Sequence, residues 1–133
     1  MKSKNARVTR GLPVGARIKT CDNSGAKVVK IFTVYGIGTT KRRRAAAGVG
    51  DKVMGSVIKG RPEMRKKVVQ CIIVRQKKEY RRPNGMRIKF EDNALVVLKD
   101  DKGNPKGTLF KGPIAKEAAV RWPAVSKVAG SII

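Results

Sequence analysis

Residues 67–98 read KVVQCIIVRQKKEYRRPNGMRIKFEDNALVVL, and this stretch decides the fold class. Residues 67–76 form a nearly continuous apolar run rich in β-branched side chains, which is typical of a buried strand. The Pro-Asn-Gly tripeptide at 83–85 predicts a tight hairpin turn, because Asn-Gly tolerates the positive φ angles that such a turn needs. Beyond the turn, 86–90 alternates apolar and charged residues, which predicts a half-buried strand, and 94–98 predicts a further one. The stretch therefore indicates short strands joined by tight turns.

The part of the chain before this stretch repeats the pattern. Strands are predicted at 16–20, 27–34 and 51–59. Clusters of turn-forming residues separate them, at 22–25 and at 60–62. This spacing predicts an all-β domain, either a small β-barrel or a sandwich, from which the hairpin extends.

The structural class changes only near the C-terminus, where a short helical segment is expected over about 113–129. This stretch begins with a proline, which suits the first position of a helix. Ile114, Ala118 and Trp122 share one face at helical spacing. Pro123 should end the first helix, and a second short one is expected to follow. The shared face either packs on the β-domain or contacts a partner protein.

The N-terminal residues 1–15 are basic and end in Gly-Leu-Pro-Val-Gly. We expect an arm that orders only against a partner, followed by a single domain over 16–133. No secretion signal is apparent, and no apolar run approaches the roughly 18 residues that a membrane span needs. These features predict a soluble, cytoplasmic protein without a membrane partner.

The charge balance predicts a polyanionic partner. The chain has 133 residues, with 32 Lys and Arg against 9 Asp and Glu, and its formal net charge is +23. A compact domain of this charge repels itself, so nucleic acid is the first candidate partner and an anionic membrane the second. Hydrophobic residues make up 41% of the chain, which is enough for a packed core.

Few residues suit catalysis. The chain has no histidine, which removes the commonest general base and the commonest metal ligand. Cys21 and Cys71 are 50 positions apart and could not close a zinc site without other ligands. Either cysteine could be a nucleophile, but small buried side chains in a reducing compartment are the more economical interpretation. No enzyme activity, metal or cofactor is expected.

The basic residues concentrate where the backbone is expected to turn. The predicted RNA-binding residues are Lys41, Arg42, Arg43 and Arg44 in a long exposed loop at 39–48; Lys59, Arg61, Arg65, Lys66 and Lys67 after the strand at 51–59; and Lys77, Lys78, Arg81 and Arg82 before the hairpin turn. Only Glu63 and Glu79 lie inside these clusters as acids. A charge run is often no more than a solvated face, but so little internal neutralisation favours a phosphate-binding surface.

The scarcity of aromatic residues and of basic helices indicates which kind of nucleic acid is bound. Aromatic residues are 5% of the chain, and Phe32, Phe90 and Phe110 are expected in the core, so base stacking is not expected from them. Tyr80 lies in a basic loop, where it either stacks on a base or is simply exposed. No predicted helix carries a row of basic residues that could enter a DNA major groove. With base stacking and DNA-groove binding disfavoured, the predicted mode is recognition of folded RNA through its shape and backbone.

Several stretches resemble a known family. The matching residues are Cys71-Ile72-Ile73-Val74, Asn84-Gly85, Phe90, Asn93 and Val96-Val97, with further matches at 21–26, 47–51 and 112–117. At this spacing they resemble the universal large-subunit ribosomal protein fourteen family, from about residue 12 to the end. The basic arm, Arg81-Arg82 and the ending Ala129-Gly130-Ser131-Ile132 are similar to the archaeal and eukaryotic branch. An archaeal source is expected.

The resemblance implies a five-stranded β-barrel with a small C-terminal helical part. It implies binding to large-subunit ribosomal RNA and a place on the face that meets the small subunit, with a bridge to small-subunit ribosomal RNA. It also implies contacts with ribosomal proteins three and twenty-four, and with a subunit anti-association factor. Two rivals stand beside it. A transient nucleic-acid chaperone would leave the large subunit in a salt wash, and an RNA-modifying enzyme would show turnover.

Overall fold

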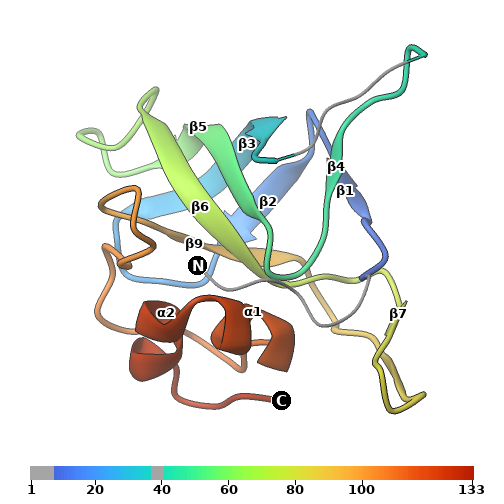
Figure 1. Cartoon of the computed structure of the whole chain (residues 1–133). Coiled ribbons are helices and arrows are strands. Elements are labelled where there is room, and N and C mark those ends of the chain that lie inside the picture. Colours follow the sequence, from blue (N-terminus) through green and yellow to red (C-terminus); the bar gives the residue numbers. More distant parts are fainter. Residues whose placement is uncertain (1–7, 37–40) are drawn as a thin grey trace.

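The structure, a computed structural model, describes residues 8–36 and 41–133 (Figure 1). Residues 1–7 of the expected arm and residues 39–40 of the expected loop lie outside the described residues.

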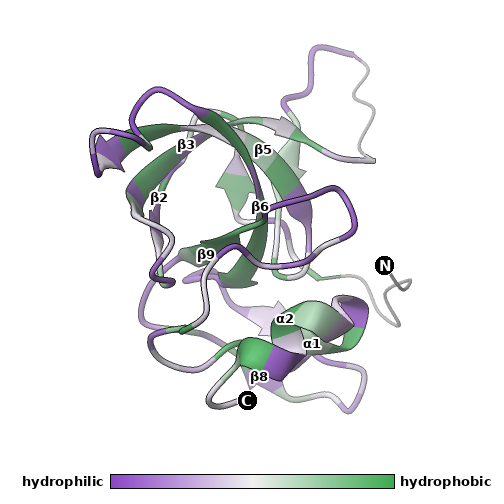
Figure 2. Ribbon diagram, turned by 90° about the vertical axis from the view of Figure 1, so that its left-hand side faces the viewer, coloured by the Kyte–Doolittle hydropathy of each residue, from purple (hydrophilic) through white to green (hydrophobic). Residues whose placement is uncertain are grey.

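Five strands close into a barrel, which Figure 2 shows as a ring. They are β2 (Arg17–Thr20), β3 (Ala26–Val34), β5 (Lys52–Gly60), β6 (Val68–Arg75) and β9 (Ala94–Val97), hydrogen-bonded in the order β2-β3-β5-β6-β9. Four neighbouring pairs are antiparallel, and the parallel pair β2–β9 closes the ring. Closure leaves no strand edge of this sheet unpaired. The all-β barrel is confirmed, and the sandwich alternative is wrong.

Two short strand pairs extend from the barrel. The strands β1 (Leu12–Pro13) and β4 (Ala46–Ala47) pair with each other, and so do β7 (Tyr80–Arg81) and β8 (Arg87–Ile88). The second pair is the predicted hairpin, and its turn places Gly85 at φ +89°. The predicted strand 86–90 is shorter than expected, because only 87–88 finds a partner strand and Met86 is exposed.

Two helices follow, α1 (Lys116–Arg121) and α2 (Pro123–Val128), and Pro123 begins α2 as expected. The first helix starts at Lys116 rather than at Pro113. The reason is a bridge between Ile114 and Ile132: the Ile114 N–H donates to Ser131 O, and the Ile133 N–H donates to Ile114 O. These bonds hold residue 114 extended.

Strands β6 and β9 are buried on both faces, which explains their continuous apolar runs. One face of each points into the barrel, through Cys71, Ile73, Leu95 and Val97. The other face packs against the helices: Ile72, Val74 and Val96 share a second core with Ile114, Ala118, Trp122 and Val125. The alternating faces of a strand therefore serve two different cores. The apolar side of the helical segment packs on the barrel, which was one of its two expected roles.

Part of the expected arm contacts the domain. Val8 belongs to the core under the helices, and Leu12 belongs to the core inside the barrel. Both side chains are buried. The boundary at residue 15 stays a prediction. No helix in the described part of the chain is long and apolar enough to cross a membrane.

Candidate nucleic-acid interface

The loop that carries Lys41, Arg42, Arg43 and Arg44 leads into β4 and projects from the barrel (Figure 1). All four side chains are exposed. The base of the loop is fixed, because β4 pairs with β1 and the Val14 N–H donates to Ala45 O at 3.0 Å. A fixed base with an exposed basic tip suits contact with a surface outside the protein.

The second basic loop, at 59–67, is held from inside. The Met64 side chain is buried in the barrel core. Backbone N–H groups of the loop donate to the barrel, Arg61 to Gly25 O and Lys66 to Val57 O, both at 2.9 Å. The loop cations Lys59, Arg61, Arg65, Lys66 and Lys67 are all exposed. The loop therefore presents its charges from a rigid frame.

Backbone strain coincides with these cations. Among the described residues, the non-glycine positions with positive φ are Lys41 (55°), Arg42 (62°) and Lys66 (63°). Each belongs to the predicted RNA-binding set. Such a conformation costs on the order of 1 kcal/mol or more for a side chain with a Cβ, and it persists where the surroundings enforce it, often at functional sites. This coincidence supports a binding role for both loops.

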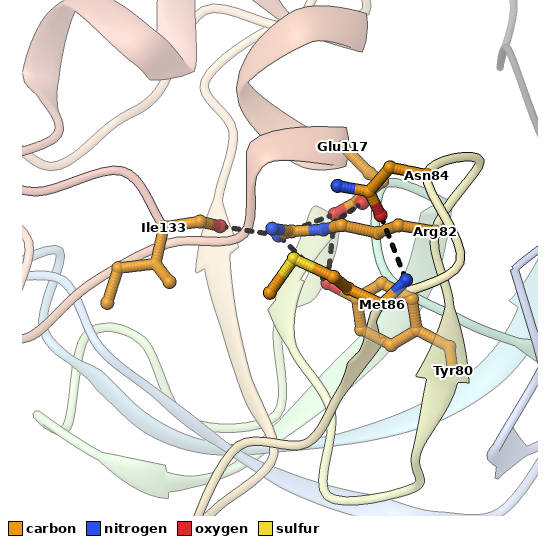
Figure 3. Close-up of polar contacts among 6 residues, drawn as sticks. All are labelled: Tyr80, Arg82, Asn84, Met86, Glu117 and Ile133. Atoms are coloured by element: carbon orange, nitrogen blue, oxygen red, sulfur yellow. Dashed lines mark hydrogen bonds and ion pairs between the residues drawn. The ribbon is translucent and has the colours of Figure 1, made fainter.

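The third basic loop divides into outward and inward residues. Lys77, Lys78 and Arg81 are exposed as expected. Tyr80 and Arg82 turn toward α1, as Figure 3 shows. The predicted exposure of Tyr80 is wrong, since its residue is 1% exposed.

A polar cluster explains the inward orientation. The Tyr80 Oη donates to Glu117 Oε2 at 2.9 Å, and Arg82 Nε donates to Glu117 Oε1 at 2.7 Å. Arg82 Nη2 also donates to Ile133 O at 2.6 Å (Figure 3). Burial and the hydrogen bond to Glu117 raise the pKa of Tyr80. The sequence missed the cluster because Glu117 and Ile133 are 35 and 51 positions from Arg82.

Four of the nine acidic residues form ion pairs in the described residues, and three of these four pairs involve arginines outside the predicted RNA-binding set. Ion pairs in the described residues join Arg75 to Asp92, Arg82 to Glu117, Arg87 to Glu79 and Arg121 to Asp51. Of the predicted RNA-binding cations in this part of the chain, only Arg82 forms one. The others form no ion pair with the acids of residues 8–36 and 41–133, so their positive charge is available to a partner.

A further basic surface lies on the barrel wall, which the sequence analysis did not include. Arg17 and Lys30 face each other directly across β2 and β3, and both are exposed. Like charges in direct cross-strand register destabilise a sheet unless something compensates them. Lys19, two residues along β2, is exposed on the same face. The alternation Arg17-Ile18-Lys19 could have shown this surface, because Ile18 marks the inward side.

The cysteines are not poised for catalysis. Both are buried and free. Burial is the main cause that raises the pKa of Cys21, to about 11, and burial also raises the pKa of Cys71. A thiol that stays protonated near neutral pH is a poor nucleophile. In the described ranges, no group of three or more Cys, Asp or Glu side chains is arranged to hold a metal ion.

Comparisons with known proteins agree on one family. The family described as ribosomal protein L14p/L23e matches residues 11–133. The chain is similar to the large ribosomal subunit protein uL14 of Nanoarchaeum equitans (strain Kin4-M), with 53% identity over 133 residues and 100% of each chain covered. It is 53% identical over 129 residues to that of Methanococcus maripaludis, covering 97% of each chain. It is 46% identical over 133 residues to that of Methanoregula boonei, covering 100% of each.

Proposed function

Because the chain belongs to the ribosomal protein L14p/L23e family, we propose that its exposed basic loops bind ribosomal RNA. As a member of this family, the chain is a structural constituent of the large ribosomal subunit. The family is a structural, non-enzymatic component of the ribosome, which confirms the prediction that the chain is not an enzyme. Membership also decides against a transient chaperone and an RNA-modifying enzyme.

One observation carries the proposal. The cations at 41–44 and 59–67 are exposed, lie on loops with fixed bases, and have no acidic partner among the described residues. Exposed Lys and Arg side chains bind phosphate oxygens and release the counterions condensed on RNA. The arginine fork also matches the geometry of a phosphate group. The proposed RNA-binding set also includes the exposed residues Lys77, Lys78 and Arg81. Arg82 contributes to it indirectly, because it anchors the loop that carries them.

The loops suit contact with more than one RNA segment. In Figure 1 the loops at 41–44 and 61–67 leave the barrel in different directions, and the hairpin leaves in a third. This supports binding of large-subunit ribosomal RNA by some loops and a bridge to small-subunit ribosomal RNA by others. A cytoplasmic ribosome is part of the same proposal.

The proposed protein partners would bind apolar side chains that the fold leaves exposed at the helical end. Val120 on α1 is 44% exposed, and Ile132 and Ile133 are 48% and 52% exposed. These residues lie at the helical end, apart from the basic loop at 41–44. We assign contacts with ribosomal proteins three and twenty-four, and with the subunit anti-association factor, to this end of the molecule.

A quadruple variant tests the RNA-binding role. Replacing Lys41, Arg42, Arg43 and Arg44 by Ala removes four exposed cations without removing a buried side chain. The variant should keep the wild-type circular dichroism spectrum and unfolding midpoint. It should lose on the order of a hundredfold in affinity for a structured large-subunit ribosomal RNA fragment at low salt.

The control variant removes the same charge at the helical end. Lys102, Lys111, Lys116 and Lys127 are all exposed, and their replacement by Ala should weaken RNA binding by much less. Equal losses in the two variants would mean that net charge alone drives binding. An unchanged affinity in the loop variant would refute the role of that loop.

A further inference from the structure

Phe32 points out of the barrel instead of into it. The sequence predicts this residue in the core, but 44% of it is exposed. Strand alternation explains this, because Val29 and Ile31 are buried whereas Lys30 and Phe32 lie on the opposite, outward side of β3. The ladder between β3 and β5 is also irregular here: Ile31 lies opposite Gly55 and Thr33 lies opposite Met54, so Phe32 has no partner of its own on β5. The bulge changes the phase of the strand after Phe32, so that Thr33 is exposed as well and Val34 returns to the core.

The surroundings of Phe32 leave its ring accessible. On the β2 side, the residue before it bonds to the chain just ahead of β2: the Gly15 N–H donates to Ile31 O at 2.7 Å, and the Ile31 N–H donates to Ala16 O at 3.0 Å. Gly15 has no side chain, and a Cβ added there would meet no atom within 4 Å. With 44% of Phe32 exposed, a flat group can lie against its ring.

Cations flank the ring. Lys30 precedes Phe32 by two residues on the outward side of β3, and Arg17 lies directly opposite Lys30 on β2. Because Lys30 and Phe32 are two residues apart on β3, Arg17 lies diagonally from Phe32, within the reach of a long side chain. Neither cation has an ion pair in the described residues. We call Arg17, Lys30 and Phe32 the outer barrel face.

We propose that the outer barrel face binds an unpaired base of RNA, which stacks on Phe32 while Arg17 and Lys30 hold the flanking phosphates. The inference deepens the proposed RNA-binding function and rests on it. It adds a second mode of contact, because the basic loops bind only the backbone whereas an aromatic ring binds a base. Every base has a π-face, so this stacking is tolerant of sequence.

Charge favours RNA over a protein as the occupant. An apolar protein surface would cover Phe32 but would have to bury Arg17 and Lys30 as well, and two like charges opposite each other are costly to desolvate. A phosphate backbone compensates both charges at once. Figure 2 places β2 and β3 away from α1 and α2, so the face is separate from the apolar helical end.

The test uses the full chain and two RNA hairpins, one fully paired and one with a single-nucleotide bulge of 2-aminopurine. Phe32→Leu keeps an apolar side chain and removes the ring, whereas Phe32→Trp keeps a ring. Leu109→Ala is the control, because Leu109 is 62% exposed at another site. We expect Phe32→Leu to weaken binding to the bulged hairpin by about tenfold and to leave binding to the paired hairpin within about twofold.

Two further readouts separate stacking from general contact. The 2-aminopurine fluorescence should be quenched by the wild type and by Phe32→Trp but not by Phe32→Leu. If the wild type and Phe32→Leu bind the bulged hairpin with equal affinity, the inference is overturned and the basic-loop proposal stays intact. Failure of the wild type to bind either hairpin at low salt would instead overturn the proposed function. Loss of a protein contact in Phe32→Leu, without a change in RNA binding, would assign the face to a protein and overturn the inference.

Discussion

Replacing Arg82 by Ala separates a structural arginine from its RNA-binding neighbours. The guanidinium joins the hairpin to α1 through Glu117 and to the last described residue through Ile133 O. The side chains of Arg82 and Glu117 are 13% and 19% exposed, so the pair is largely removed from water. After the change, the Tyr80 hydroxyl is the remaining hydrogen-bond partner of the Glu117 carboxylate among the side chains of the described residues.

The size of the effect follows from this geometry. Removing one partner of a fully buried ion pair costs about 3–5 kcal/mol, and the remaining exposure of both groups reduces this figure. We expect a loss of about 2–3 kcal/mol in the free energy of unfolding. For a domain of this size, that corresponds to a fall of roughly 10 °C in Tm.

Arg81→Ala is the matched control, because Arg81 is the adjacent arginine and is exposed. Urea unfolding followed by circular dichroism should show a change within about 0.5 kcal/mol for Arg81→Ala. RNA affinity below the unfolding transition should show the reverse order, with the larger loss in Arg81→Ala. Equal stability of the two variants would refute the structural role given to Arg82.

Two other changes probe the packing of the barrel and the state of its thiols. Gly55→Ala should lower the free energy of unfolding, measured by urea titration, by about 3 kcal/mol, because a Cβ there would lie 2.5 Å from Val29 Cγ1. The control Gly130→Ala should leave this free energy nearly unchanged, because Gly130 has open space around it. At pH 8 the Cys21 thiol should react with iodoacetamide about a hundredfold more slowly in the native protein than in guanidinium, since its pKa is about 11 instead of 9.0. Because the native state holds this proton more tightly, the stability that it contributes is present below pH 9.0 and is lost as the pH rises toward about 11. Urea midpoints across that pH range would measure this loss. Equal alkylation rates in the native and unfolded states would contradict the burial of Cys21.

The sequence predicts the barrel well because its strands obey local rules. Residues 71–74 and 94–97 are apolar at every position, and the structure explains this by burial on two faces. The hairpin follows from Asn84-Gly85, whose conformational preference is local. The start of α1 could not be predicted, because residue 114 is held extended by residues 131–133, which are near it only in the folded chain.

In the candidate site, too, the sequence predicts features that follow from local residues and misses features that depend on distant ones. Exposed loop cations are visible in the sequence, since no fold can easily bury so many charges. The burial of Tyr80 depends on Glu117, which is 37 positions away in the sequence. Phe32 lies on the outward side by its alternation with Val29 and Ile31, but residues 28–34 are apolar on both faces, so the sequence does not show which face is buried. Periodicity assigns each residue of a strand to one of two faces, but which face is buried depends on the rest of the fold.

The salt dependence of RNA binding tests the central claim most directly. The purified chain would be titrated with a structured large-subunit ribosomal RNA fragment between 50 and 200 mM monovalent salt. If the exposed loop cations bind phosphates, log affinity should fall linearly with log salt, with a loss on the order of a hundredfold or more across this range, and replacing the four cations at 41–44 by Ala should reduce the slope by about 3. A loss of less than about threefold in the wild type, or an unchanged slope in the variant, would contradict the account.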